Sequence, residues 1–253
     1  MTMHLSRAFV LSSADYRETS RLVQMFCQNE GRISLIAKGI RSAKSPKAQL
    51  LDGFNLLQVK YNLKDGETLG LLTGLEVEKV FGSIRADLSA YARASYWFEI
   101  IKIAAQGRLA SPAIFATTEK FLTAFEHDAK GVSPDQATSE SMFTGFLITL
   151  CEQLGFGLHL HNCGNCGASE PLVRIDLPGG NLLCPRCAGN VSNTQLVDAP
   201  VLQFLKTSAQ GHAGAIRDRA TFIKSITLLN RFLEEHLEHR LRSFEFLKTS
   251  IDR

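Results

Sequence analysis

Four cysteines in two closely spaced pairs constrain the fold of this 253-residue chain more than any other feature of its sequence. Cys163 and Cys166 form the first pair, Cys184 and Cys187 form the second, and seventeen residues separate the pairs. This spacing is typical of a zinc site in which four thiolates surround one ion as a tetrahedron. Because four protein ligands leave no position for water or substrate, the spacing predicts one structural zinc ion per chain rather than a catalytic one.

The residues between the two pairs predict a β-hairpin that joins two metal-binding knuckles. Arg174–Leu177 has strand character, and Pro178–Asn181 is typical of a turn. The pattern therefore predicts a zinc ribbon at about residues 158–192. Two disulfides, or cysteines buried in a core, are the alternatives, and disulfides require an oxidising compartment. His159 and His161 precede the first knuckle and could replace a sulfur, although we interpret them as ordinary loop residues.

The amino-terminal sequence gives no indication of export. Met1–Arg7 lacks the charged segment and the continuous apolar segment of a signal peptide, and no apolar run approaches membrane-spanning length. We therefore expect a cytoplasmic protein with reduced thiols and no membrane association. Cys27 and Cys151 lie in apolar runs, which favours buried, unreactive thiols at both positions.

Short alternating segments predict strands up to about residue 82. In Arg32–Gly39, for example, Ile33, Leu35 and Ala37 alternate with polar residues, as in a half-buried strand. Five short strands suit a small closed barrel, and the oligonucleotide-binding (OB) fold is one such barrel, although periodicity alone does not separate it from others. The predicted strands are His4–Ser12, Arg21–Cys27, Arg32–Gly39, Leu56–Asn62 and Thr68–Val80.

Beyond about residue 85 the apolar residues recur at the period of helices. We expect three helices before the zinc ribbon and a long final helix over Thr221–Arg242, whose apolar face contains Phe222, Ile226, Leu229 and Leu233. The predicted fold class is therefore an α+β multidomain chain. We expect residues 1–82 to form a small β-barrel domain, for which the OB fold is one candidate, and residues 83–253 to form an all-α helical domain with the inserted four-cysteine zinc ribbon.

The positive charge of the chain is concentrated near its amino terminus. The net charge is only +3, but residues 1–50 carry eight Lys or Arg against three Asp or Glu. An acid-free cluster lies on the third predicted strand and the loop after it, and two interpretations stay open for it. The cluster could be a solvated loop, or it could follow DNA phosphates beside a groove of the barrel. Its members, our candidate DNA-binding residues, are Arg32, Lys38, Arg41, Lys44 and Lys47.

The sequence contains none of the common catalytic motifs. The phosphate-binding G-x-x-x-x-G-K-[ST], the G-x-S-x-G elbow and the zinc-binding H-E-x-x-H are all missing. We therefore expect a binding protein and not an enzyme. The alternative is a zinc-ribbon enzyme or RNA-handling protein that uses a barrel to bind its substrate.

In order along the chain, the residues resemble the family of the bacterial DNA repair protein RecO. The resemblance covers the whole chain, and no single motif decides it. The amino-terminal matches are Arg17–Val23, Glu30–Arg32, Ala37–Arg41, Leu50 and Phe54. The carboxy-terminal matches are Leu154–Phe156, the two cysteine pairs, Gly179–Gly180, His236 and Arg240–Ser243.

The resemblance implies an OB-fold barrel followed by a helical domain with a zinc ribbon. It implies a recombination mediator that binds single- and double-stranded DNA and anneals complementary strands without an enzymatic cofactor. It also implies protein partners: RecR, the carboxy-terminal tail of single-stranded DNA-binding protein and, indirectly, RecA, which the mediator helps to load. Some members lack the ribbon cysteines, whereas this sequence has all four. No motif assigns residues to the protein partners.

Overall fold

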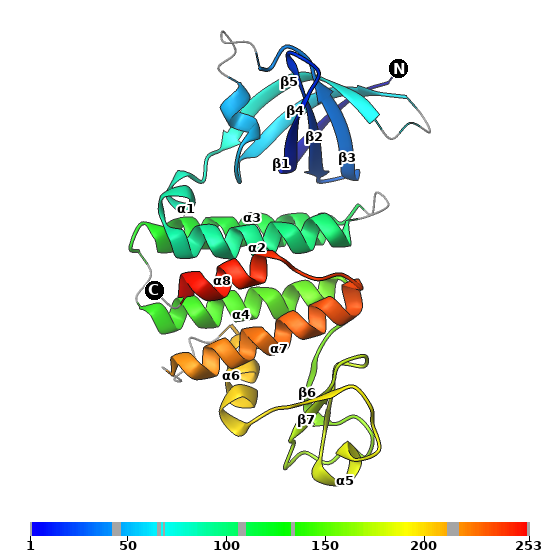
Figure 1. Ribbon diagram of the computed structural model, residues 1–253, viewed down its shortest axis with the longest axis vertical. Coiled ribbons are helices and arrows are strands. Elements are labelled where there is room, and N and C mark those ends of the chain that lie inside the picture. Colours follow the sequence, from blue (N-terminus) through cyan, green and yellow to red (C-terminus); the bar gives the residue numbers. More distant parts are fainter. Residues whose placement is uncertain are drawn as a thin grey trace. The chain divides into compact units, whose positions relative to one another are not determined.

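A computed structural model describes residues 2–41, 47–64, 67, 69–105, 110–132, 135–211 and 218–251 (Figure 1). The chain divides into two compact units, Met1–Ala129 and Lys130–Arg253. The change from strands to helices falls earlier, between residues 79 and 82. The predicted order of a β-sheet domain followed by helices is confirmed, and the predicted domain boundary at residue 82 stays a prediction.

The first unit begins with five strands that close into a barrel in the order β1-β2-β3-β5-β4 (Figure 1). β3 and β5 pair in parallel, and the other neighbours pair antiparallel. A short 3-10 helix, η1, spans Ala48–Leu51. The strands are β1 (Thr2–Tyr16), β2 (Ser20–Cys27), β3 (Gly31–Ala37), β4 (Leu56–Leu63) and β5 (Leu69–Lys79).

The first strand is long because it has a different partner along each half. Its residues 2–9 pair with β4 and its residues 8–16 pair with β2, with a register shift between Val10 and Ser12. A register shift of this kind bends a strand and increases its twist, which allows one strand to serve both sides of a small barrel. The interior is filled by apolar residues such as Val23, Leu35 and Val59, all fully buried.

Three helices complete the first unit: α1 (Gly82–Ala86), α2 (Leu88–Ala104) and α3 (Pro112–Ala129). The Asp87 side chain accepts a hydrogen bond from the backbone N–H of Ala90 and so caps α2. Trp97 of α2 stacks on Phe121 of α3, with ring centroids 4.4 Å apart, and its Nε1 donates to Thr118. The single tryptophan is therefore a core residue.

An aromatic cluster joins one end of the barrel to α2 and α3. Phe9 of β1 lies 4.9 Å from Phe115 of α3 and 5.9 Å from Phe98 of α2 by ring centroids. Phe26 of β2 also contacts Phe115, and Phe54 contacts Phe98. We call this the helix end of the barrel. The opposite end, formed by the β1–β2 turn and the residues after β3, we call the turn end.

The second unit contains four helices and a small sheet with a one-turn helix. The sheet has the strand order β6-β8-β7-β9, and β7 and β8 form the predicted antiparallel hairpin between the cysteine pairs. Its helices are α4 (Gln136–Gln153), α6 (Ala199–Ala209), α7 (Arg219–Leu237) and α8 (Ser243–Ile251). The other elements are β6 (His159–Cys163), β7 (Arg174–Asp176), β8 (Asn181–Leu183), α5 (Pro185–Ala188) and β9 (Thr194–Leu196).

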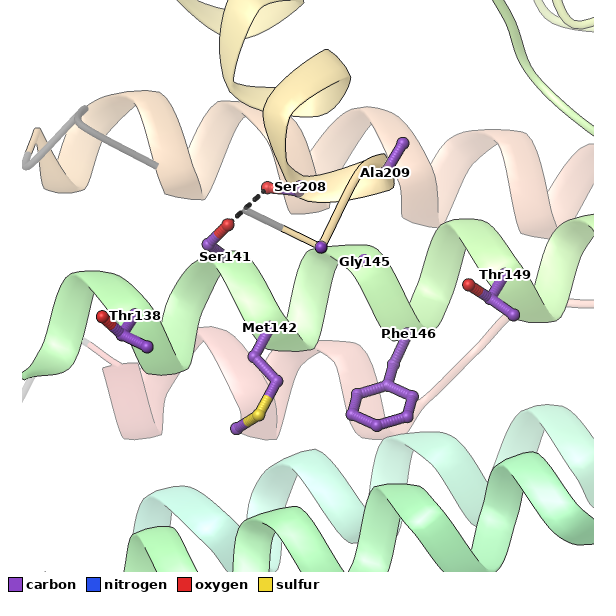
Figure 2. Close-up of a pocket in the computed structure, with 9 residues that line it drawn as sticks. Thr138, Ser141, Met142, Gly145, Phe146, Thr149, Ser208 and Ala209 are labelled. Carbon is purple, nitrogen blue, oxygen red and sulfur yellow. Dashed lines mark hydrogen bonds between the residues drawn. The ribbon is translucent and has the colours of Figure 1, made fainter. Parts of the chain in front are cut away.

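Small residues let α4 and the end of α6 approach closely. Ser141 and Ser208 share a buried hydrogen bond of 3.0 Å, which Figure 2 shows, and a Cβ on Gly145 would lie 2.5 Å from the carbonyl oxygen of Ser208. Glycine is therefore required at position 145 for this crossing. The predicted apolar face of α7 is confirmed, since Phe222 and Leu229 are buried along with the rest of the stripe.

Candidate functional site

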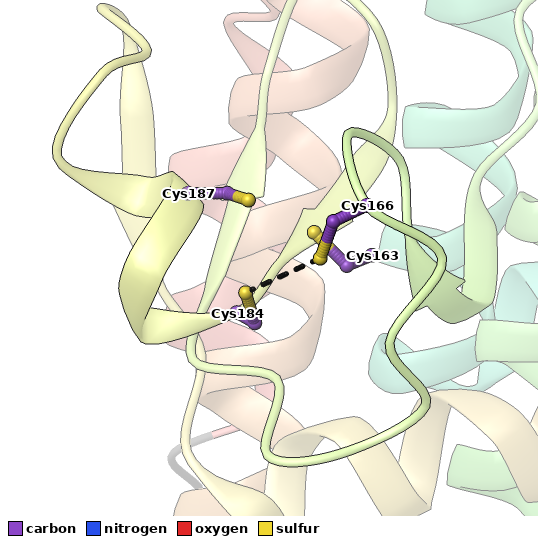
Figure 3. Close-up of side chains that lie close together, drawn as sticks. All are labelled: Cys163, Cys166, Cys184 and Cys187. Carbon is purple, nitrogen blue, oxygen red and sulfur yellow. Dashed lines mark hydrogen bonds between the residues drawn. The ribbon is translucent and has the colours of Figure 1, made fainter.

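The four cysteines converge in the small sheet of the second unit (Figure 3). Cys163 ends β6 and Cys166 follows in the next turn, while Cys184 follows β8 and Cys187 lies in α5. β6 and β8 are paired, with Cys163 opposite Leu182, so the two knuckles lie side by side. As a result, the four Sγ atoms all lie within 4.8 Å of one another.

The spacing of the sulfurs fits a tetrahedral metal ion. Four sulfurs placed about 2.3 Å from a central zinc ion lie about 3.8 Å from one another. The Sγ atoms of Cys166 and Cys184 are 3.7 Å apart, well beyond the length of a disulfide, and all six cysteines are free thiols. The four residues therefore form a group that could hold a metal ion, and the identity of that ion belongs to the proposal below.

The backbone around the knuckles favours thiolates at two of the four positions. The pKa of Cys163 is lowered to about 6, chiefly by the backbone N–H of Cys184, and further by those of Cys166 and Asn165. The backbone N–H of Cys187 lowers the pKa of Cys184. By contrast, the hydrogen bond with Cys166 raises the pKa of Cys187 to about 12. Four neighbouring sulfurs cannot all lose their protons without a cation among them, which is the charge that a divalent metal supplies.

The two histidines before the first knuckle stand apart from the sulfurs. His159 and His161 belong to β6, where both are exposed, so they lie on a strand rather than in the loop that the sequence predicts. The residues that the structure describes contain one group of three or more potential metal ligands, and it is made of the four cysteines. Cys27 and Cys151 are buried, and burial raises the pKa of both thiols, which makes them unreactive.

Contacts with α7 hold the small sheet in the second unit. The Asn193 side chain donates to Glu235, and Arg231 donates to Gln195, over 2.9 Å and 3.2 Å. Gly180, in the β7–β8 turn, approaches Phe232 so closely that an added Cβ would lie 3.2 Å from its ring. Gly180 also has a φ of 66°, which glycine adopts without strain. The cysteine cluster thus belongs to a small sheet that is held against α7.

The predicted DNA-binding cations lie in three different surroundings. Arg32 is half-buried at the helix end, where its Nη1 donates to the carbonyl oxygen of Lys102 in the last turn of α2 at 3.1 Å. Arg41 lies at the turn end, 3.1 Å from the carboxylate of Asp15, and also donates to two carbonyls of the β1–β2 turn. Lys38 and Lys47 are exposed, and Lys44 lies outside the described residues.

The outward face of β2 and β3 connects the two ends of the barrel. Leu22 lies opposite Ile36 and Gln24 lies opposite Ser34, and these half-buried residues alternate with core residues such as Leu35. Opposite residues share a face, so Leu22, Gln24, Ser34 and Ile36 all point away from the barrel interior. Neither strand contains an acidic residue. We call this surface the β2–β3 face.

The aromatic residues near the barrel, like the cations, differ between its helix end and its turn end. Phe9 and Phe54 belong to the aromatic cluster of the helix end, and Tyr61 is buried with its ring stacked on His4 at 5.0 Å. Tyr16, the last residue of β1, is half-buried at the turn end, and the guanidinium of Arg17 lies 5.3 Å from its ring centroid. The pattern of charged residues in the sequence does not indicate that Tyr16 and Arg17 contact each other.

A cavity in the second unit is lined by small, hydroxyl-bearing and apolar side chains. It has a volume of about 380 Å³ and lies along α4 beside the end of α6 (Figure 2). Its described lining residues carry no ionisable side chain, and Met142 and Phe146 supply its apolar wall.

In the described part of the chain, no helix is both long enough and apolar enough to span a bilayer.

Two family models match successive parts of the chain. The model "Recombination protein O N terminal" matches residues 1–81, and "Recombination protein O C terminal" matches residues 85–245. Similar curated proteins are called "DNA repair protein RecO". The one from Myxococcus xanthus is 29% identical over 95% of both chains, and the one from Pelobacter propionicus is 29% identical over 96% of this chain and 95% of its own. The one from Geobacter sulfurreducens is 31% identical over 71% of both chains.

Proposed function

Because the chain belongs to the recombination protein O family, whose members act in DNA repair and recombination, we propose that it binds DNA on the β2–β3 face. The observation that carries this proposal is an acid-free face with exposed cations at the turn end. Lys38 follows β3 directly and Lys47 precedes η1, and both side chains are exposed. A phosphate backbone is the ligand that such a face attracts without reading sequence.

The barrel topology supports the assignment to the OB fold. Five strands in the order β1-β2-β3-β5-β4, with β3 and β5 parallel, form a closed barrel of the size that this fold requires. In OB folds, the face of strands 2 and 3 and the adjoining loops bind oligonucleotides. The β2–β3 face corresponds to that surface.

We further propose that the chain is a recombination mediator and not an enzyme. It binds single- and double-stranded DNA, anneals complementary single strands and, with RecR, helps to load RecA onto strands coated by single-stranded DNA-binding protein, whose carboxy-terminal tail it engages. Family membership supports these steps. The sequence contains none of the common catalytic motifs, which also favours a binding role.

The metal of the cysteine cluster is proposed to be one structural zinc ion. Cys163, Cys166, Cys184 and Cys187 would supply all four ligands, and the thiolate set and sulfur spacing match zinc. Bound zinc would neutralise the sulfurs and hold the two knuckles together. Elemental analysis of protein purified without chelator should find about one zinc per chain; a value near zero in folded protein would contradict this assignment.

An annealing assay without nucleoside triphosphate tests the proposed function. Two complementary oligonucleotides should pair faster in the presence of the protein, and Lys38→Ala/Lys47→Ala should reduce this acceleration. The control is Lys60→Ala, compared with each single lysine variant, because it removes one exposed cation from β4, on another side of the barrel. If the wild-type protein neither binds nor anneals the strands, the proposal is wrong. Equal loss from Lys60→Ala would show that general charge, and not this face, attracts the DNA.

A further inference from the structure

We propose that Tyr16 and Arg17 form a stacking platform for an unpaired base at the turn end of the β2–β3 face. The platform would make this face select single-stranded over double-stranded DNA. This inference rests on the proposed function, because it presupposes that the face binds DNA. It adds the residues that distinguish an exposed base from a paired one.

The strand register places Tyr16 on the outward side of the barrel. Asp15 lies opposite Arg21, which in turn lies opposite the buried core residue Ala37, so this row is on the inward side of the strands. Asp15 itself lies beyond the core, and its side chain is 58% exposed. Tyr16 is the next residue along β1 and therefore points the other way. Ala14, two residues earlier, lies opposite Leu22 of the β2–β3 face. The Tyr16 ring is thus in line with that face.

Two carboxylates near this platform are already paired with arginines. Asp52 lies 2.8 Å from the guanidinium of Arg21. Asp15 lies 3.1 Å from the guanidinium of Arg41 and 3.5 Å from that of Arg21. These distances are those of ion pairs, which reduces the repulsion that a free carboxylate would exert on a phosphate. Glu18 is exposed in the same turn, but its neighbour Arg17 is exposed as well. The turn end therefore keeps cations available around the tyrosine ring.

Arg17 has a backbone conformation that favours glycine. Its φ is 55°, in the left-handed region, where a Cβ is strained. Despite this strain, the chain has an arginine there, and its guanidinium lies over the Tyr16 ring at 5.3 Å. Asn193 and Glu238 have a similar φ, so the conformation alone assigns no function, and Arg17 is singled out by its position over the ring. In this position the Arg17 guanidinium covers one side of the Tyr16 ring and can contact a phosphate next to the stacked base.

A stacking tyrosine distinguishes single strands from duplexes by access to the base. Every base has a flat aromatic face, so stacking tolerates any sequence, but bases inside a duplex already have both faces covered. The length of the face also suits a short single strand. Lys38 lies six positions after Arg32, which corresponds to about 20 Å along a strand and to a site of about four nucleotides.

The test compares an oligothymidylate with an oligomer of the same length that has no bases. Both carry the same phosphates, so binding through cations alone predicts equal affinity. The stacking platform predicts that the wild-type full chain binds the oligothymidylate at least about fivefold more tightly than the abasic oligomer, the lower end for stacking one base. A duplex of equal length should bind less tightly than the oligothymidylate at the same salt concentration.

Variants test whether the Tyr16 ring causes the preference for the oligothymidylate over the abasic oligomer. Tyr16→Leu should lower affinity for the oligothymidylate to that for the abasic oligomer, whereas Tyr16→Phe should keep the wild-type preference. Arg17→Gly should weaken binding while its thermal midpoint stays close to wild type, because glycine relieves the left-handed strain. Tyr91→Leu is the control, since Tyr91 is an exposed tyrosine of the first unit that lies on α2, where its ring contacts Phe54 at the helix end.

The outcomes separate this inference from the proposed function. Equal affinity of the wild-type protein for both oligomers, with binding that still weakens in salt, would overturn the stacking platform and leave DNA binding intact. The platform is likewise overturned if Tyr16→Leu is folded and keeps the preference. Failure of the wild-type protein to bind either oligomer or the duplex would overturn the proposed function, and the platform with it.

Discussion

The two ends of the barrel use the same kind of side chain in different ways. At the helix end, Arg32 is half-buried and donates a hydrogen bond to the last turn of α2. Six residues later, at the turn end, Lys38 is exposed and belongs to none of the ion pairs among the described residues. Arg7 of β1 is a second cation at the helix end with protein partners. It forms ion pairs with Glu78 of β5 and Glu119 of α3 at 2.6 Å and 2.9 Å.

The difference between these cations lies in their surroundings and not in their charge. A cation at a helix carboxy terminus satisfies free carbonyls and interacts favourably with the helix dipole. A lysine without a protein partner keeps its full charge available for a phosphate. Arg41 lies between these cases, because its pairing with Asp15 leaves only part of its charge available. The helix end is therefore expected to affect stability and the turn end is expected to affect binding.

The largest effect is expected from truncating the aromatic cluster of the helix end. Phe115 is fully enclosed among Phe9, Phe26 and the Arg7 guanidinium. Phe115→Ala should lower the free energy of unfolding by about 3–5 kcal/mol, because it removes a buried ring and leaves a cavity. Chemical denaturation measures this change. A loss below about 1 kcal/mol would mean that the barrel does not depend on this contact.

A smaller effect should follow from removing the charge of Arg32. Arg32→Met keeps an apolar stem but removes the hydrogen bond to the Lys102 carbonyl, which should cost about 1 kcal/mol. Lys38→Met is the matched control at the other end of the same strand, and its unfolding free energy should stay within about 0.5 kcal/mol of wild type. If the two variants lose equal stability, the proposed contrast between the barrel ends is wrong.

The smallest effect is a difference in acid sensitivity at the helix end. The hydrogen bond from Arg7 is the main cause of a lowered pKa at Glu78. A carboxylate with a lowered folded-state pKa stabilises the fold above its unfolded pKa of about 4.3 and loses that contribution as the pH falls toward the folded value. The free energy of unfolding of Glu78→Gln should therefore fall less than that of the wild type as the pH is lowered below about 4.5. Identical pH profiles would contradict the role of this pair.

The cysteine cluster could be predicted from the sequence because each C-x-x-C pair forms its own turn. The pairing of β6 with β8 then brings Cys163 and Cys184 together. Strand alternation likewise predicted the barrel strands, although it ended the first strand at Ser12 instead of Tyr16. Residues 13–16 are partly or fully exposed and show no alternation, and they are strand because β2 supplies their hydrogen-bonding partners.

The role of each cation could not be read from the sequence. The partner of Arg32 is a backbone carbonyl seventy residues away, and Arg41 pairs with Asp15 across a strand. Both contacts depend on the tertiary fold, whereas a charge pattern records only neighbours along the chain. For the same reason, Tyr16 could not be separated from Phe9 and Phe54, which the helices cover.

The most direct test is the salt dependence of single-strand binding in Lys38→Ala/Lys47→Ala. Each phosphate contact contributes about −0.7 to the slope of log affinity against log salt concentration. The double variant should therefore flatten the slope by up to about 1.4, while Arg32→Met keeps the wild-type slope in its folded fraction. A wild-type slope in the double variant, or a flattened slope in Arg32→Met, would contradict the assignment of DNA binding to the turn end.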